Sequence, residues 1–206
     1  MRVNRRSVRP LVQRDMSKSG LQLIVISLLL AWACRAPQVE DSAPNDAAVL
    51  RVVLAHFCSS NEAGYFVLNA SSVSPALYDP PAGIWSSRGQ AAANMLRRNE
   101  FPRRIPQQIA CDKLQLQPSN AIEAALARKL PPTNPPNPGW EGFYDTFKNA
   151  RGVVSVSLPG YSYSGGTACV YLAVTAGGLA GAGGYAYLEK QNGKWVLTSR
   201  ERAWIA

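Results

Sequence analysis

The chain has 206 residues, with 22 Lys or Arg against 13 Asp or Glu and a formal net charge of +9. The charge is uneven, because residues 1–33 hold six basic residues and one acidic residue, and residues 34–206 hold 16 and 12. The excess positive charge is therefore partly a property of the N-terminus and does not indicate a nucleic-acid-binding surface. Apolar residues make up 47% of the chain, which is sufficient for one buried core.

An apolar run of 13 residues, Leu21 to Ala33, follows a basic N-terminal segment. It is shorter than the roughly 20 residues that a membrane-spanning helix needs, and it has the length of the apolar part of a signal peptide. The segment before it is long for a signal peptide, whereas translation from Met16 would give one of ordinary length. We therefore predict that residues 1–33 are a signal peptide, with Met16 as an alternative start.

The apolar run ends in Leu30-Ala31-Trp32-Ala33-Cys34. This ending resembles the lipobox of bacterial lipoproteins, in which cleavage precedes a cysteine that receives a diacylglyceryl group. The resemblance implies a mature chain that begins at Cys34 and is held on a membrane surface by acyl chains such as palmitate. It departs from the usual pattern, because Ala31 stands where leucine is usual and Trp32 is bulky. An ordinary Ala-x-Ala cleavage site and an uncleaved anchor remain alternatives, and all three export the domain.

The next segment, residues 35–45, is polar, contains two prolines and shows no apolar period. This composition is typical of a disordered tether, which a lipid-anchored domain needs between its anchor and its fold. We expect a tether over residues 34–45 and a single folded domain over residues 46–206. About 160 residues would bury roughly 70% of the surface of the unfolded chain, which is enough for independent stability.

Apolar residues at helical spacing predict helices at residues 46–57, 121–130 and 140–147, and residues 90–98 can form a short one. Ser42 or Asn45 is expected to cap the first helix. Asn120 and Glu123 have the spacing of a capping box for the helix that contains them. The last helix has an aromatic face, which we expect to pack on the sheet rather than to bind a ligand. Its rings belong to Trp140, Phe143, Tyr144 and Phe147.

The C-terminal segment contains Asn192-Gly193, the strongest short-range signal for a β-hairpin, because a type I′ turn needs positive φ at both central residues. A two-residue turn pairs Leu188 with Leu197 and Tyr187 with Thr198. Further strands are predicted at residues 65–68, 113–117, 153–158 and 167–174. The predicted fold class is α+β, an antiparallel sheet with a C-terminal meander, packed on one face by two or three helices.

A pattern of turn glycines and core aromatics runs through the last third of the chain. It consists of Gly139-Trp140, Phe143-Tyr144, Gly152, Leu188-Glu189-Lys190, Gly193-Lys194-Trp195 and Trp204-Ile205. In these positions the chain resembles the C-terminal half of small exported bacterial proteins of uncharacterised function. The resemblance implies a fold, and it brings no substrate, partner or catalytic residue with it.

The residue types that carry chemistry form no recognisable pattern. His56 is the only histidine, and Cys58, two residues on, points to a different side of the predicted helix. The cysteines lack the paired spacing of metal ligands, and no Gly-x-Ser-x-Gly nucleophile motif is present. The glycine-rich residues 177–184 precede a strand, so we interpret them as a flexible hairpin loop and not as a phosphate-binding loop. We expect no catalytic residue, no metal ion and no cofactor.

The cysteines predict one disulfide. Exported cysteines tend to pair in an oxidising compartment. Cys169 lies in an apolar strand, where a buried free thiol is tolerated, whereas Cys58 ends a helix and Cys111 lies in irregular chain. We therefore favour a Cys58–Cys111 bridge if Cys34 carries lipid. If Cys34 is cleaved without lipid, four cysteines remain and two bridges can form.

Four arginines form the densest charged cluster of the expected mature chain: Arg97, Arg98, Arg103 and Arg104. They are either a solvated loop or a contact for an anionic partner such as lipid head groups, lipopolysaccharide, peptidoglycan or an acidic protein. The predicted export argues against nucleic acid as the partner.

These predictions describe a non-catalytic lipoprotein of the bacterial cell envelope that faces the periplasm. Its partners are the membrane, through lipid on Cys34, and an envelope protein or anionic polymer, bound through the open face of the sheet or through residues 177–184. One alternative is an envelope hydrolase whose scattered carboxylates converge only in three dimensions, and another is a soluble periplasmic or secreted protein. A deep pocket that holds two carboxylates within about 10 Å of each other would favour the hydrolase.

Overall fold

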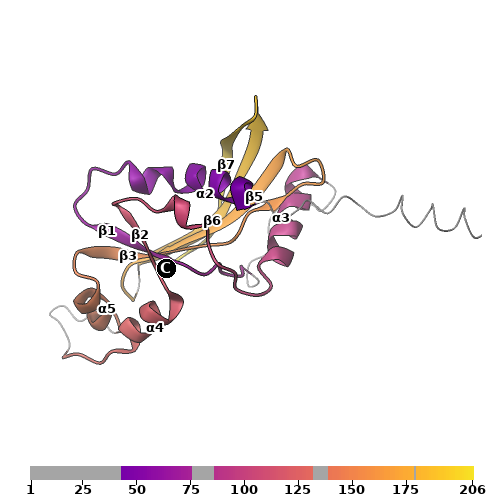
Figure 1. The fold of residues 1–206 in the computed structure, drawn as a ribbon. Helices are drawn as coiled ribbons and strands as arrows, with labels where there is room; N and C mark the ends of the chain where they lie inside the picture. The colour runs from indigo at the N-terminus through magenta and orange to yellow at the C-terminus, as the bar shows by residue number, and fades with distance from the viewer. Residues whose placement is uncertain (1–42, 76–85, 132–138, 179) are drawn as a thin grey trace, which may run out of the picture. The chain divides into compact units, whose positions relative to one another are not determined.

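The structure, a computed structural model, describes residues 43–75, 86–131, 139–178 and 180–206. The strands are β1 (Tyr65–Asn69), β2 (Leu114–Gln117), β3 (Ala150–Val156), β4 (Gly160–Tyr161), β5 (Thr167–Thr175), β6 (Gly181–Gln191) and β7 (Lys194–Ile205). They form one sheet in the order β2-β1-β3-β5-β6-β7, with β4 paired to β5 (Figure 1). Strand β1 runs parallel to β2 and β3, and the pairs from β3 to β7 are antiparallel. The predicted α+β class and C-terminal meander are confirmed.

The helices are α2 (Ala43–Cys58), α3 (Ser87–Arg98), α4 (Ser119–Ala127) and α5 (Glu141–Thr146), with a 3-10 turn, η1, at Gln107–Ile109. Helix α2 begins three residues before the predicted domain start, so residues 43–45 of the expected tether are helical. Asn45 therefore lies inside the helix and not at its cap, and Ser42 lies outside the described residues. The expected signal peptide, Cys34 and the rest of the expected tether also lie outside them.

Helix α4 does not use the capping box expected from Asn120 and Glu123. It begins two residues earlier than predicted, at Ser119, with Pro118 in the cap position and no side-chain cap bond. Its first turn is instead tied to β1, because Ser119 Oγ donates to Asn69 Oδ1 at 2.8 Å. The tertiary contact determines the start of this helix more strongly than the local spacing.

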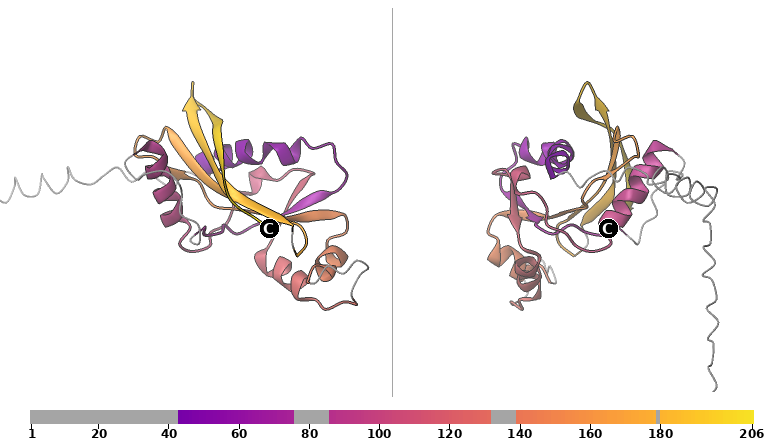
Figure 2. Two further views of the ribbon diagram at one scale, coloured as in Figure 1. Left: turned by 180° about the vertical axis from the view of Figure 1, so that it is seen from behind. Right: turned by 45° about the vertical axis from the view of Figure 1, so that its right-hand side comes forward.

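The helices cover both faces of the sheet, so the expectation of helices on one face is wrong. Strand β5 shows why, since its side chains alternate. Ala168 and Val170 join the core under α2, which we call the α2 face, whereas Cys169 and Tyr171 join the core under α3, the α3 face. The right-hand view of Figure 2 shows the sheet passing between these two helices. Helices α4 and α5 pack on the opposite face from α2, with the expected aromatic cluster against β1 and β3.

The C-terminal hairpin turns where predicted. Asn192 and Gly193 have φ values of 49° and 78°, as a type I′ turn requires. Leu188 pairs with Leu197, and both belong to the core on the α2 face. Trp195 is buried in the same core, so the hairpin is a central element and not a peripheral arm.

The pairing of Tyr187 departs from the prediction. It lies opposite Ser199 and not Thr198, because a register shift between Tyr187 and Leu188 inserts one extra residue in β7. The extra residue, Thr198, donates its hydroxyl to the carbonyl oxygen of Tyr187 at 3.1 Å.

A disulfide joins Cys58, the last residue of α2, to Cys111, just before β2, with 6.0 Å between the two Cα atoms. This is the pair that the sequence analysis favours. Cys169 is a buried free thiol. The bridge holds the C-terminal end of α2 against the N-terminal half of the sheet.

Candidate functional site

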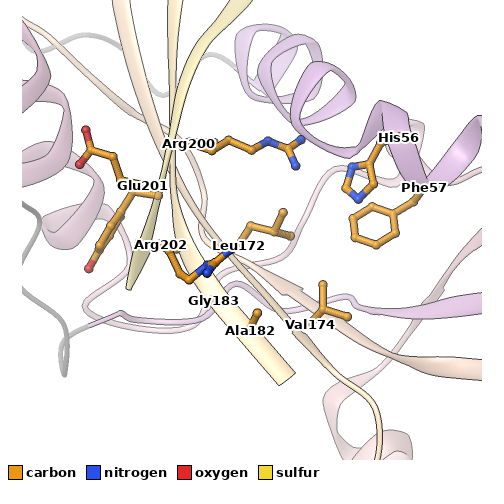
Figure 3. Close-up of a pocket in the computed structure, with 12 residues that line it drawn as sticks. His56, Phe57, Leu172, Val174, Ala182, Gly183, Arg200, Glu201 and Arg202 are labelled. Atoms are coloured by element: carbon orange, nitrogen blue, oxygen red, sulfur yellow. The ribbon is translucent and has the colours of Figure 1, made fainter. Parts of the chain in front are cut away.

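A cleft of about 310 Å³ opens between the C-terminal end of α2 and the α2 face of β5, β6 and β7 (Figure 3). Helix α2 contributes His56 and Phe57 to its lining. A volume of this size lies at the lower end of the range found for small-molecule sites. We call it the α2 cleft, and it is the candidate functional site.

Small residues of β6 form the floor of the α2 cleft. Ala182, Gly184 and Ala186 occupy alternate positions of the strand, so they share one face and leave room above it. The backbone also requires glycine at position 184, because a Cβ there would lie 2.2 Å from the carbonyl oxygen of Glu201. The register of β6 and β7 shifts at this point, between Gly183 and Gly184.

The glycine-rich segment expected to be a loop is therefore partly strand. Gly181, Gly183 and Gly184 all lie in β6 and pair with β5, and Gly183 and Gly184 also pair with β7 on the other side. Gly183 gives room to the indole of Trp204, since a Cβ at this position would lie 2.2 Å from its Nε1 atom. The glycines thus serve close packing and not a mobile loop.

Apolar side chains make the walls of the α2 cleft. Leu172 and Val174 stand on the α2 face of β5, and Phe57 lies across from them on α2. The Phe57 ring packs edge-on against Phe66 of β1, with 5.1 Å between the ring centroids. This contact fixes the wall that α2 supplies.

Two arginines of β7 add positive charge to the α2 cleft. Arg200 donates from Nη2 to the carbonyl oxygen of Val53 at 3.1 Å, which places it on the α2 face, and Figure 3 shows it reaching toward His56. Arg202 lies two residues on and lines the same cleft. The pKa of His56 is lowered from 6.5 by partial burial and by the nearby Arg200 charge, against a raising contribution from its hydrogen bond with the Val53 backbone. The imidazole is therefore mainly neutral at pH 7.

The carboxylate that stands between these arginines in the sequence points away from them. Glu201 follows Arg200 on β7, so its side chain lies on the opposite face of the sheet, as Figure 3 shows. There it lies 4.0 Å from Arg88 of α3. Among the described lining residues Glu201 is the one carboxylate, so the α2 cleft has no pair of carboxylates for hydrolysis.

The free thiol of Cys169 lies on the α3 face and is chemically quiet. Burial raises the pKa of Cys169 to about 12, a hydrogen bond with Tyr187 opposes this rise, and the charge of Glu201 adds to it. The thiol is therefore protonated at neutral pH and is not a nucleophile.

The arginine cluster is divided by the fold, and Arg98 must be removed from it. Arg98 is 9% exposed and forms two hydrogen bonds with the Asp46 carboxylate, at 3.0 and 2.9 Å, and another with the carbonyl oxygen of Pro159. Tyr161 donates its hydroxyl to the same carboxylate at 2.8 Å. Arg98 therefore ties α3 to the start of α2 and is not a contact for an anionic partner.

The other three arginines are exposed. Arg97 lies in the last turn of α3, whereas Arg103 and Arg104 lie in the following irregular segment, beside the bridge between Ser71 and Arg104. Arg103 and Arg104, but not Arg97, line a hollow together with the start of α4. The structure thus leaves an anionic contact at Arg97, Arg103 and Arg104 as a prediction.

The described ranges show neither a metal-binding cluster nor a membrane-spanning helix. Those ranges contain no cluster of three or more His, Cys, Asp or Glu side chains placed to hold a metal ion. No helix within them is long and apolar enough to cross a membrane.

Sequence reasoning missed the α2 cleft, although part of its signal is visible. Ala182, Gly184 and Ala186 alternate at strand spacing, as do Arg200 and Arg202, and the hairpin register places the two sets side by side. The spacing does not predict the position of α2, which brings His56 over these small residues and arginines. Comparisons with protein-family models, curated protein sequences and solved structures give no match for this chain.

Proposed function

We propose that this chain is a non-catalytic binding module of the bacterial envelope, held on a membrane surface by lipid on Cys34, which binds its ligand in the α2 cleft. The observation that carries the proposal is the cleft itself, an apolar hollow with two arginines and no carboxylate pair. Apolar lining with a few well-placed polar groups is the usual composition of a ligand site.

Export is supported by two independent features. The N-terminal residues have the basic segment, apolar run and small residues of a signal peptide, followed by Cys34. The Cys58–Cys111 disulfide fits an oxidising compartment, since such bridges are rare in the reducing cytosol.

The alternative of a hydrolase receives less support from the same groups. Glu201 faces away from the α2 cleft, and the Cys169 thiol is buried on the other face and protonated. Within the described chain the His56 imidazole contacts the Val53 backbone and the Phe57 ring and lies near Arg200, and none of these supplies a nucleophile or an orienting carboxylate. Binding without covalent chemistry is therefore the better reading of the geometry.

Expression of the full chain and of Cys34→Ala in a bacterium, followed by membrane fractionation and intact-mass analysis, tests the anchor. We expect the parent in the membrane fraction, with a mass that corresponds to cleavage before Cys34 plus acyl chains. Cys34→Ala should lose the acyl mass and leave the membrane fraction, whereas Cys169→Ala, a matched loss of one thiol, should behave as the parent.

Other masses decide between the alternatives. A chain that retains residues 21–33 contradicts export with cleavage. A parent that is cleaved but carries no lipid supports the soluble periplasmic or secreted protein, and the anchor is then rejected.

A further inference from the structure

We propose that the α2 cleft takes an anionic small molecule with an apolar body, whose acid group lies between Arg200 and Arg202 and whose body lies over β6. The inference deepens the proposed binding function and rests on it. It is built from the charge, the shape and the size of the cleft.

The charge of the α2 cleft is uncompensated. Neither Arg200 nor Arg202 forms an ion pair with a carboxylate of the described chain, and Glu201 between them pairs on the other face with Arg88. A guanidinium presents several N–H donors in a planar fork that matches a carboxylate, sulfonate or phosphate. Two such groups beside one hollow favour an anion over a neutral or cationic ligand.

The position of Arg200 is already fixed before a ligand binds. Its Nη2 atom donates to the Val53 carbonyl oxygen, which holds the side chain toward α2 and His56. A side chain that is ordered in advance loses less conformational freedom on binding. Most of its donors remain available, since this bond uses one of five N–H groups.

The shape and size of the cleft call for an apolar body. The floor consists of Ala182, Gly184 and Ala186, and Leu172 and Phe57 rise beside it. The volume, about 310 Å³, is roughly twice that of the 150 Å³ apolar cavity known to hold a benzene molecule. The ligand class is therefore an acid with a body of about two small rings or a short acyl chain.

Two fluorescent dyes of the same shape test the charge requirement on the full chain. 1-Anilinonaphthalene-8-sulfonate is an anion with an apolar two-part body, and N-phenyl-1-naphthylamine is the same body without the sulfonate. We expect the anion to bind at least about tenfold more tightly, because a hydrogen bond with a charged partner is worth about that factor. Residues 21–33 are the same in every variant, so dye bound there cancels in comparisons between variants.

Matched variants locate the binding. Arg200→Gln/Arg202→Gln should reduce the affinity for the anionic dye by about tenfold or more and leave the neutral dye unchanged. Lys129→Gln/Lys194→Gln removes the same charge at exposed positions outside the cleft and outside the arginine cluster, and should change neither affinity. Ala182→Phe fills the exposed part of the cleft floor and should lower the affinity for both dyes. Arg202→Gln alone is the mild variant, because the Arg202 side chain makes no hydrogen bond within the described chain and the strand pairing of its backbone is unaffected by the substitution.

Equal affinity of the parent for the two dyes overturns the inference. An equal loss of affinity for the anionic dye in the two double variants overturns it as well. If Arg202→Gln binds the anionic dye as the parent does, an acid group between the two arginines is also excluded. These results are independent of the anchor. A soluble chain with the expected dye pattern rejects the lipid anchor alone, and an anchored chain that fails the dye test rejects the ligand class alone.

Discussion

At the scale of single residues, the most constrained group is the buried carboxylate of Asp46. It accepts two bonds from Arg98 and one from the Tyr161 hydroxyl, and all three residues are buried. Burial, and then the Asp46 charge, raise the pKa of Tyr161 far above its usual value, so the phenol remains a donor at every accessible pH. One carboxylate thus connects α2, α3 and β4.

Asp46→Ala should destabilise the domain by about 3–5 kcal/mol, because it leaves the Arg98 charge buried without its partner. Urea denaturation of parent and variant measures the difference in unfolding free energy. Asp145→Ala is the matched control, since Asp145 pairs with Arg128 and Lys148 at the surface and its loss should not change the midpoint measurably. Equal midpoints for Asp46→Ala and the parent would show that the network adds nothing to stability.

His56 predicts a pH dependence of ligand binding. Its pKa lies below 6.5 in the free protein, so the imidazole gains its proton only as the pH falls through that lower value. A bound anion stabilises the charged form and raises this pKa, so anion affinity should increase as the pH falls from 7.5 to 5.5. The sulfonate dye stays ionised over this range, and its affinity in parent and His56→Gln provides the measurement. A parent whose affinity is flat or falls on acidification contradicts the prediction.

At the scale of elements, the hairpin and the disulfide hold the two walls of the α2 cleft. Trp195, near the turn of the hairpin, packs its ring 5.8 Å from that of Tyr161, and Lys190 lies over its face. The Cys58–Cys111 bridge fixes the end of α2 directly after His56 and Phe57. Each element can be weakened separately, which allows their contributions to be measured.

Trp195→Ala should cost about 3–5 kcal/mol, the range for removing a large buried aromatic side chain. The neighbouring Val196→Ala is the control, since Val196 points to the other side of β7 and is 39% exposed. Thermal melts of both variants compare them directly. If the two substitutions lower the midpoint equally, the ring of Trp195 is not part of the core.

Cys58→Ser/Cys111→Ser should lower the unfolding free energy by about 2–4 kcal/mol, because the bridge closes a loop between residues 53 positions apart. The double substitution should also lower the affinity for the anionic dye, since the end of α2 is then held only by packing. The parent in reductant should match the double variant. An unchanged dye affinity would show that the wall of the α2 cleft does not depend on the bridge.

At the scale of the whole molecule, the predictable part of the fold is the part with local contacts. The turn at Asn192-Gly193 and the pairing of Leu188 with Leu197 follow from residues close in sequence. The parallel pairing of β1 with β2 and β3 does not, because the partners lie about 50 and 85 residues away and their choice depends on packing across the molecule. Strand alternation predicts which side chains share a face, but the helix that covers each face is decided by tertiary contacts.

The same distinction between local and distant contacts explains which site residues could be predicted from the sequence. Cys58 and Cys111 could be paired by elimination, since Cys169 sits in an apolar strand. Arg98 could not be separated from Arg97, because its partner, Asp46, is 52 residues earlier in the chain. The α2 cleft requires α2 to lie over β7, a contact between residues about 150 positions apart.

The number of cysteine thiols that react with an alkylating reagent depends both on how Cys34 is processed and on the fold. If Cys34 carries lipid, the native protein should show no thiol that reacts with an alkylating reagent, because Cys58 and Cys111 are bridged and Cys169 is buried. Unfolding without reductant should expose one thiol, that of Cys169. A cleaved chain without lipid should show a reactive Cys34 before unfolding. Peptide mapping after alkylation gives these counts, and label on both Cys58 and Cys111 would disprove the bridge.

The parallel pairing of β1 has a consequence for the order of folding. Both neighbours of β1 lie after it in the chain, and β3 ends at residue 156, whereas β5, β6 and β7 pair with strands next to them in sequence. Local pairings form faster, so the C-terminal meander should fold first and β1 should join it later. A chain that crosses a membrane N-terminus first would thus deliver α2 and β1 long before β1 has partners. The topology would thus delay completion of the sheet until residue 156 has arrived, and an unpaired strand edge would be exposed to aggregation or to a chaperone in the meantime.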